Sequence, residues 1–217
     1  MCITFFHVSA LPGSPYKLVL AMNRDEFTSR PTEAASWRSG LLAGWDLQPG
    51  REGGTWLAMD ARGRVGLLTN IFTGGVLDKE ARGRGFLVVD WLKGDQTAEE
   101  YLTTLSKDPA TYNPFNLVLC ERTSDGLYTA TRYSRGLKGH TENFGPVTET
   151  VGTFGVGNHP QHQPYRYITL QYSTVQSITR RYSSTVHYGT VQYITVQYFT
   201  ERYSTVHYTT VLYITES

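Results

Sequence analysis

The cysteine directly after the initiator methionine is the first residue whose position suggests chemistry. Removal of Met1 would leave a thiol and a free α-amino group on Cys2. An α-amine has a reference pKa of about 7.7–8.0 and can take the proton of a thiol whose pKa is about 8.5. One residue would then supply nucleophile and base, as in N-terminal-nucleophile enzymes. The alternatives are a small apolar residue that opens a buried strand, or a site of lipid attachment.

Four consecutive polar residues, Asn23-Arg24-Asp25-Glu26, are expected at the end of the second strand. A hairpin between Cys2–Val8 and Tyr16–Met22 would bring Arg24 and Asp25 beside Cys2. The charge of Arg24 could lower the pKa of the thiol, and Asp25 could hold the α-ammonium group in place. A salt-bridged turn would explain the same residues.

The elements that must position these residues alternate short β-rich runs with turn residues. Two further hairpins are predicted, one from Thr55–Asp60 with Val65–Ile71 and one from Asn116–Glu121 with Leu127–Tyr133, and a late strand covers Val151–Val156. Helices are predicted over Phe86–Lys93 and after Thr97, where Thr97 and Glu100 have the spacing of a capping box. Antiparallel strands with a helical pair between them predict an α+β fold.

Composition narrows the classes of partner. Lys and Arg number 20 against 19 Asp and Glu, so the formal charge is +1, which argues against nucleic acid or an acidic membrane as the main partner. Apolar runs are too short for a transmembrane segment, and two cysteines exclude a disulfide scaffold. A soluble cytoplasmic protein is expected. No metal site is expected, because Pro160 and Pro164 break any helix that would align His159 with His162.

The last 53 residues have a different composition. Tyr, Thr and Val occupy 27 of them, and tyrosine recurs every five residues from Tyr188 to Tyr213. A period of five matches neither a strand nor a helix. We interpret residues 165–217 as a low-complexity translated repeat, disordered or non-native. An adhesive tail and a genuine β-rich extension are the alternatives.

Six short motifs occur in order along the first part of the chain. They are Met1-Cys2-Ile3, the Asn23–Phe27 segment with Arg30-Pro31-Thr32, Gly53–Leu57, Leu68-Thr69-Asn70, Ala81–Gly85 and Tyr112–Leu117. Together they resemble the NRDE family, and closely its animal branch, which is linked to transport and Golgi organization. The resemblance covers residues 1 to about 158.

The resemblance implies an N-terminal-nucleophile-hydrolase-like αββα sandwich, two antiparallel sheets between helical layers. By analogy of fold, Cys2 would be the nucleophile, Arg24 and Asp25 would position it, and Asn70 would donate to an oxyanion. Asn23, Trp56 and Asn158 are expected to contact a ligand. Trp56, Trp91 and the phenylalanines would line a pocket for haem or an acyl chain, although core packing explains them as well.

The chain departs from the family after the Gly155–Asn158 step. Family members continue with an apolar segment that leads to Pro-Trp, whereas here a Pro/His/Gln junction at residues 159–164 leads into the repeat. We therefore predict an NRDE domain over residues 1–158 whose sandwich is incomplete, with an open sheet edge and an exposed apolar face.

The residues and the resemblance are compatible with three functions. The resemblance favours a cytoplasmic factor of Golgi organization and protein secretion that handles haem or an acyl group as cargo, with no required cofactor and with mitochondrial or Golgi association. The second is a cysteine N-terminal-nucleophile hydrolase of a small amide or thioester. The third is a truncated, non-functional product.

Overall fold

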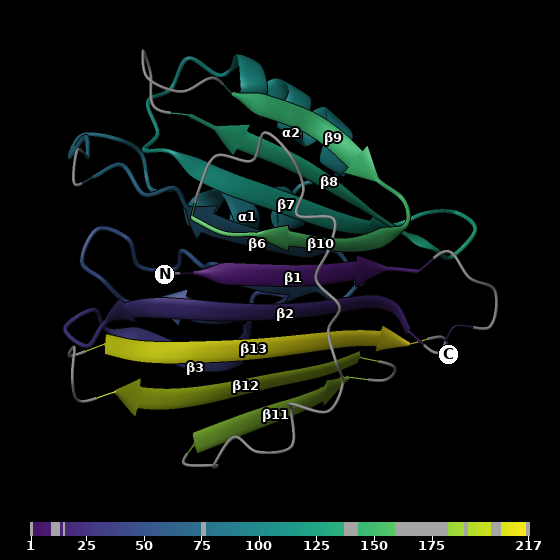
Figure 1. Cartoon of the computed structure of the whole chain (residues 1–217), viewed down its shortest axis with the longest axis horizontal. Coiled ribbons are helices and arrows are strands. Elements are labelled where there is room, and N and C mark those ends of the chain that lie inside the picture. The colour runs from purple at the N-terminus through teal and green to yellow at the C-terminus, as the bar shows by residue number, and fades with distance from the viewer. Residues whose placement is uncertain are drawn as a thin grey trace.

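Two antiparallel sheets and two helices make up the computed structural model (Figure 1). The structure describes residues 2–9, 14, 16–74, 77–136 and 143–158, and the backbone of residues 182–188, 191–200 and 205–215. The α+β class predicted from the sequence is confirmed.

The first sheet has six strands in the order β10-β1-β2-β13-β12-β11. Its strands are β1 (Ile3–Val8), β2 (Tyr16–Phe27), β10 (Gly152–Val156), β11 (Tyr182–Tyr188), β12 (Val191–Thr200) and β13 (Thr205–Thr215). The N-terminal strand thus lies between β2 and β10, and β10 follows it by more than 140 residues in sequence.

The second sheet runs in chain order from β3 to β9. Its strands are β3 (Thr32–Arg38), β4 (Leu41–Asp46), β5 (Leu57–Asp60), β6 (Val65–Asn70), β7 (Phe115–Arg122), β8 (Tyr128–Arg135) and β9 (Phe144–Glu149). The inner strands β4 and β5 are buried along their whole length, because both faces of this sheet are covered.

Two apolar clusters explain this burial. Between the sheets, Phe6, Leu20 and Met22 of the first sheet pack with Met59 and Val118 of the second. On the other face of the second sheet lie α1 (Phe86–Lys93) and α2 (Ala98–Lys107), which are joined to the strands through a second cluster. The described residues therefore form a sheet–sheet–helix stack. Neither helix of this part has the length and apolar character needed to cross a membrane.

The predicted elements correspond closely to those observed. All three hairpins form, the late strand is β10, and α1 spans the predicted Phe86–Lys93. Thr97 caps α2 through a complete capping box with Glu100. The strands β3, β4 and β9 were not predicted from the sequence, and the predicted second strand ends too early. β2 continues to Phe27, so Asn23–Glu26 lies inside a strand rather than after one.

The repeat region supplies three strands to the first sheet. β13 pairs with β2 from Thr205 opposite Phe27 to Thr215 opposite Tyr16, so β2 has a partner on both sides. The edge that an incomplete sandwich was expected to leave open is thus occupied by β13. The division into an NRDE domain, a junction and a non-native repeat stays a prediction, and the junction lies outside the described residues.

Candidate functional site

Strand register brings three predicted site residues to one end of the first sheet. Ile3 pairs with Asn23, and Thr4 pairs with Val156. One step further along the ladders, Cys2 lies beside Arg24 on β2 and beside Asn158 after β10. Consistently, a Cβ placed on Gly157 would lie 3.9 Å from the carbonyl oxygen of Cys2.

Strand alternation separates the predicted partners of Cys2. Because the NRDE residues continue β2, successive side chains point to opposite faces of the sheet. Arg24 continues the inner, buried face of Leu20 and Met22 and is only 6% exposed. Asn23 and Asp25 lie on the other face, where Asn23 Nδ2 donates to Asp25 Oδ1 at 3.0 Å. The expectation that both charged side chains flank the thiol from a strand end is therefore corrected: Arg24 is on the inner face and Asp25 is not.

The guanidinium of Arg24 is fixed by two neighbours. Its Nη2 donates to Glu26 Oε2 at 3.0 Å, two residues along the same face. Its Cζ lies 4.0 Å from the ring centroid of Trp56, which is a close cation–π contact. Trp56, predicted as a ligand contact, thus supports the arginine beside Cys2.

The Cys2 thiol is not activated by its surroundings in this chain. Burial raises the pKa of Cys2, while a hydrogen bond from the Asp25 backbone and the charge of Arg24 oppose that shift. The thiol is therefore protonated at neutral pH, and nucleophilic attack would need a nearby base. The α-amine of Cys2 could act as this base only after Met1 is removed. Met1 itself lies outside the described residues.

Asn158 links the end of the first sheet to the second sheet. Its Nδ2 donates to the carbonyl oxygen of Asn70, and its own carbonyl accepts from the Phe72 N–H at 2.9 Å. The Asn158 Oδ1 is buried and accepts no hydrogen bond from the described residues. The Asn70 side chain is exposed at the end of β6, so Asn70 reaches this site through its backbone.

A buried polar network beneath this junction was missed from the sequence. Asn116 Nδ2 donates to the Gly157 carbonyl at 2.9 Å, and Thr69 Oγ1 donates to the same oxygen at 2.9 Å. Ser134 Oγ donates to Asn116 Oδ1. Because unsatisfied buried polar groups are costly, these bonds fix the chain just before Asn158. Thr69 and Asn116 belong to the motifs that resemble the NRDE family, so the sequence did mark both residues. No role had been predicted for either of them.

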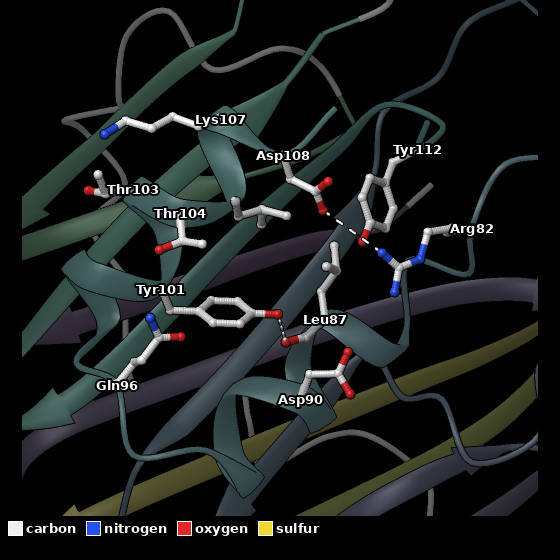
Figure 2. Close-up of a pocket in the computed structure, with 11 residues that line it drawn as sticks. Arg82, Leu87, Asp90, Gln96, Tyr101, Thr103, Thr104, Lys107, Asp108 and Tyr112 are labelled. Carbon is white, nitrogen blue, oxygen red and sulfur yellow. Dashed lines mark hydrogen bonds and ion pairs between the residues drawn. The ribbon is translucent and has the colours of Figure 1, made fainter. Parts of the chain in front are cut away.

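A pocket of about 550 Å³ lies between the helices and the two paired segments that carry Arg82, before α1, and Tyr112, after α2 (Figure 2). In it the Tyr101 hydroxyl donates to the Leu87 carbonyl at 3.0 Å. Arg82 Nη1 lies 3.9 Å from Asp108 Oδ2, and its Cζ is 5.5 Å from the Tyr112 ring centroid. Most of the lining residues carry a polar or charged group, and several contact one another. None of the predicted site residues lines this pocket.

The aromatic residues considered for a haem or acyl-chain pocket have different surroundings. Trp91 is 1% exposed in the cluster beneath the helices, and its Nε1 donates to the Gln96 carbonyl at 3.1 Å. Trp56 lies at the Cys2 end of the molecule. His159 and His162 lie outside the described residues. Within the described ones, no three His, Cys, Asp or Glu side chains are grouped as a metal site would require.

Comparison with known proteins gives a consistent match. The family model described as Transport and Golgi organisation 2 matches residues 1–213. The chain is 39% identical over 171 residues to the Transport and Golgi organization protein 2 homolog of Bos taurus, covering 76% of this chain and 60% of that protein. It is 38% identical to the Homo sapiens homolog with the same coverage. It is 35% identical over 178 residues to Transport and Golgi organization protein 2 of Drosophila melanogaster, covering 77% and 61%. The chain thus spans about 60% of the length of these relatives.

Proposed function

The chain belongs to the Transport and Golgi organisation 2 family, and from this membership we propose that the protein is a factor of Golgi organization and protein secretion. The observation that carries the proposal is the family match over residues 1–213, which confirms the resemblance seen in the motifs. We place its action in the cytoplasm, with association to the Golgi or to mitochondria.

A rescue experiment tests this role. Insect cells depleted of their own relative would be given this chain, tagged, and scored for Golgi morphology by microscopy and for secretion of a reporter enzyme. We expect restored secretion and compact Golgi stacks, with the tag in the cytosol and near the Golgi or mitochondria. A stable, soluble chain that restores neither would contradict the role and would support the view that this chain is a truncated, non-functional product.

We propose further that the protein carries a small hydrophobic ligand, haem or an acyl group, at the Cys2 end of the sheets. Trp56 offers an aromatic surface there, and the buried Oδ1 of Asn158 offers an acceptor that no described residue uses. Haem titration should give a saturable Soret change that Trp56→Ala weakens at least tenfold. Trp37→Ala, at an exposed position of strand β3, is the matched control and should bind as the parent does. A linear, unsaturable change would contradict cargo binding.

A second candidate function is a cysteine N-terminal-nucleophile hydrolase with the corresponding sandwich fold. This function is favoured because Cys2, Arg24 and Asn158 lie side by side although they come from three separate segments. In this mechanism the Cys2 α-amine accepts the thiol proton, the thiolate attacks an amide or thioester carbonyl, and the leaving group takes that proton.

Intact mass and turnover together test the hydrolase. Loss of Met1 is required, because the base does not otherwise exist. Cys2→Ser should abolish turnover of small amides and thioesters, whereas Cys120→Ser, in the core strand β7, should retain it. Retained Met1 in the protein from its own cells would exclude this mechanism.

A further inference from the structure

Two arginines, Arg51 and Arg84, lie where the segment before α1 meets the turn after β4. The two segments approach closely because glycines face each other: a Cβ on Gly54 would lie 3.5 Å from the Gly85 Cα, and the Thr55 N–H donates to the Gly85 carbonyl at 3.2 Å. Arg51 leads into this turn, and its Nη1 lies only 3.0 Å from the position of a Cβ on Gly83.

The segment before α1 is held from the other side as well. The Arg82 N–H donates to the Thr111 carbonyl at 3.0 Å, and Arg84 Nη1 donates to the Pro114 carbonyl at 2.8 Å. These bonds hold Arg84 in place, and the charges of Arg30 and Arg51 are close enough to lower its pKa.

The charges at this site do not balance. Arg30 Nη2 lies 2.6 Å from Asp46 Oδ2, and Arg30 Nη1 lies 3.7 Å from Glu26 Oε2, so Arg30 is paired. Arg51 donates to the Ala81 carbonyl at 3.3 Å, and Arg84 donates to a carbonyl as described. Among the described residues no carboxylate pairs with Arg51 or Arg84. Neither of these two guanidinium groups therefore has a carboxylate partner in the described part of the chain.

This concentration of positive charge is unfavourable without an anion. Burial, followed by the charges of Arg30 and Arg51, lowers the pKa of Arg84 to about 10, and Glu26 only partly opposes this. Arg84 nevertheless stays protonated at neutral pH. The start of α1 adds to the field, because Gly85 provides no side-chain cap and the first turn has no acidic residue.

We propose that Arg51 and Arg84 bind the oxyanion group of a small molecule, a carboxylate or a phosphate. A guanidinium group is planar and can donate two parallel hydrogen bonds to a carboxylate or a phosphate. The same contact neutralises the charge of the anion. The site is joined to the Cys2 end of the first sheet through Glu26, which contacts both Arg24 and Arg30. It does not depend on any reaction of Cys2.

Calorimetric titration of the full chain with inorganic phosphate, pyrophosphate, acetate and citrate tests the proposal. We expect saturable binding that weakens as NaCl is raised. Arg84→Gln and Arg51→Gln should each weaken binding at least tenfold. Arg122→Gln is the matched control, since Arg122 is exposed at the end of β7 and also donates to a backbone carbonyl. Binding by the phosphates alone assigns a phosphate, and binding by the carboxylates alone assigns a carboxylate.

Thermal unfolding separates binding from a merely structural role. Without anion, removal of the Arg51 charge should leave the unfolding temperature unchanged or raise it, because like-charge repulsion is relieved. Added phosphate or citrate should raise that temperature for the parent chain and not for Arg51→Gln. If Arg84→Gln does not fold, the titration and thermal unfolding of Arg51→Gln alone test the proposal. Absence of saturable binding by all four probes, or equal weakening by Arg122→Gln, would overturn the proposal. Neither result bears on the Golgi rescue or on Met1 removal.

Discussion

Two arginines that share one carboxylate show how differently neighbouring residues contribute to stability. Arg64 is buried, and its Nε lies 2.8 Å from Asp60 Oδ2. Its Nη2 also donates to the carbonyls of Leu92 and Gly94 at the end of α1, at 2.6 and 3.0 Å. Arg64 therefore neutralises a buried carboxylate and satisfies carbonyls that the helix leaves unpaired.

We predict that Arg64→Ala lowers the free energy of unfolding by about 3–5 kcal/mol, because it leaves the buried Asp60 without its inner partner. Urea denaturation followed by circular dichroism measures this. Arg62→Ala is the control. The Arg62 side chain is 56% exposed although its Nε lies 3.0 Å from the same carboxylate, so we expect a loss below about 1 kcal/mol. Equal losses of unfolding free energy for the two variants would contradict the argument that burial makes the Arg64 ion pair the stronger one.

The reactivity of Cys2 should follow the direction of its pKa. Burial raises the pKa of the Cys2 thiol above its ordinary value, and only the thiolate reacts with iodoacetamide. In the chain that retains Met1, labelling at pH 7 should be slow, and its rate should keep rising with pH beyond 9. Peptide mapping of the labelled protein measures the rate.

Cys120 provides the internal reference for that measurement. It is fully buried in β7, and burial raises its pKa to about 12. It should stay unlabelled until the protein is unfolded in urea. A Cys2 labelling rate that levels off below pH 8 would contradict the prediction and would point instead to a base that activates the thiol.

At the scale of elements, the start of α2 is the clearest local determinant. Thr97 Oγ1 accepts from the Glu100 N–H at 3.2 Å, and Glu100 Oε2 accepts from the Thr97 N–H at 2.9 Å. We predict that Thr97→Ala destabilises the protein by about 1 kcal/mol, because a helix N–H loses its acceptor. Thr104→Ala tests the same residue type at an exposed position inside α2, where alanine is the better helix former. It should be neutral or slightly stabilising, and a larger loss there than at Thr97 would refute the capping argument.

At the same scale, one strand decides the geometry of the candidate site. Extension of β2 to Phe27 makes the NRDE residues part of a ladder with β1 on one side and β13 on the other. Arg24 is then directed inward, while Asn23 and Asp25 are directed outward. A strand that ended at Met22 would not impose this alternation.

At the scale of the whole molecule, the C-terminal strands β11, β12 and β13 extend the first sheet beyond β2. β13 pairs with β2 along nearly the full length of that strand, and the family match extends to residue 213. We predict that a chain ending at residue 164 has a lower unfolding temperature and associates in solution, because the edge of β2 would be unpaired. Calorimetry and size-exclusion chromatography measure both properties.

The opposite outcome would support the interpretation of residues 165–217 as a non-native repeat. In that case the truncated chain would stay monomeric with an unchanged unfolding temperature, and the functional domain would be residues 1–158 as proposed from the motifs. Hydrogen exchange on the full chain gives an independent reading, since pairing with β13 should protect amides of β2.

The sequence by itself determined the local elements and the family. Hairpin turns, the capping box of Thr97 and both ends of α1 depend on interactions within a few residues, so they were predicted correctly. The strands β3, β4 and β9 were missed because their burial or pairing comes from segments distant in the chain rather than from a period-two pattern.

Only the tertiary structure decided which residues meet. Cys2 lies beside Asn158 because β1 pairs with β10, and Arg24 is separated from Asp25 by the pleat of β2. The segments that carry Arg51 and Arg84 meet because their glycines let them pack backbone to backbone. Contacts of this kind depend on sheet register and on which distant segments pack together. The spacing of residues within one segment predicts neither.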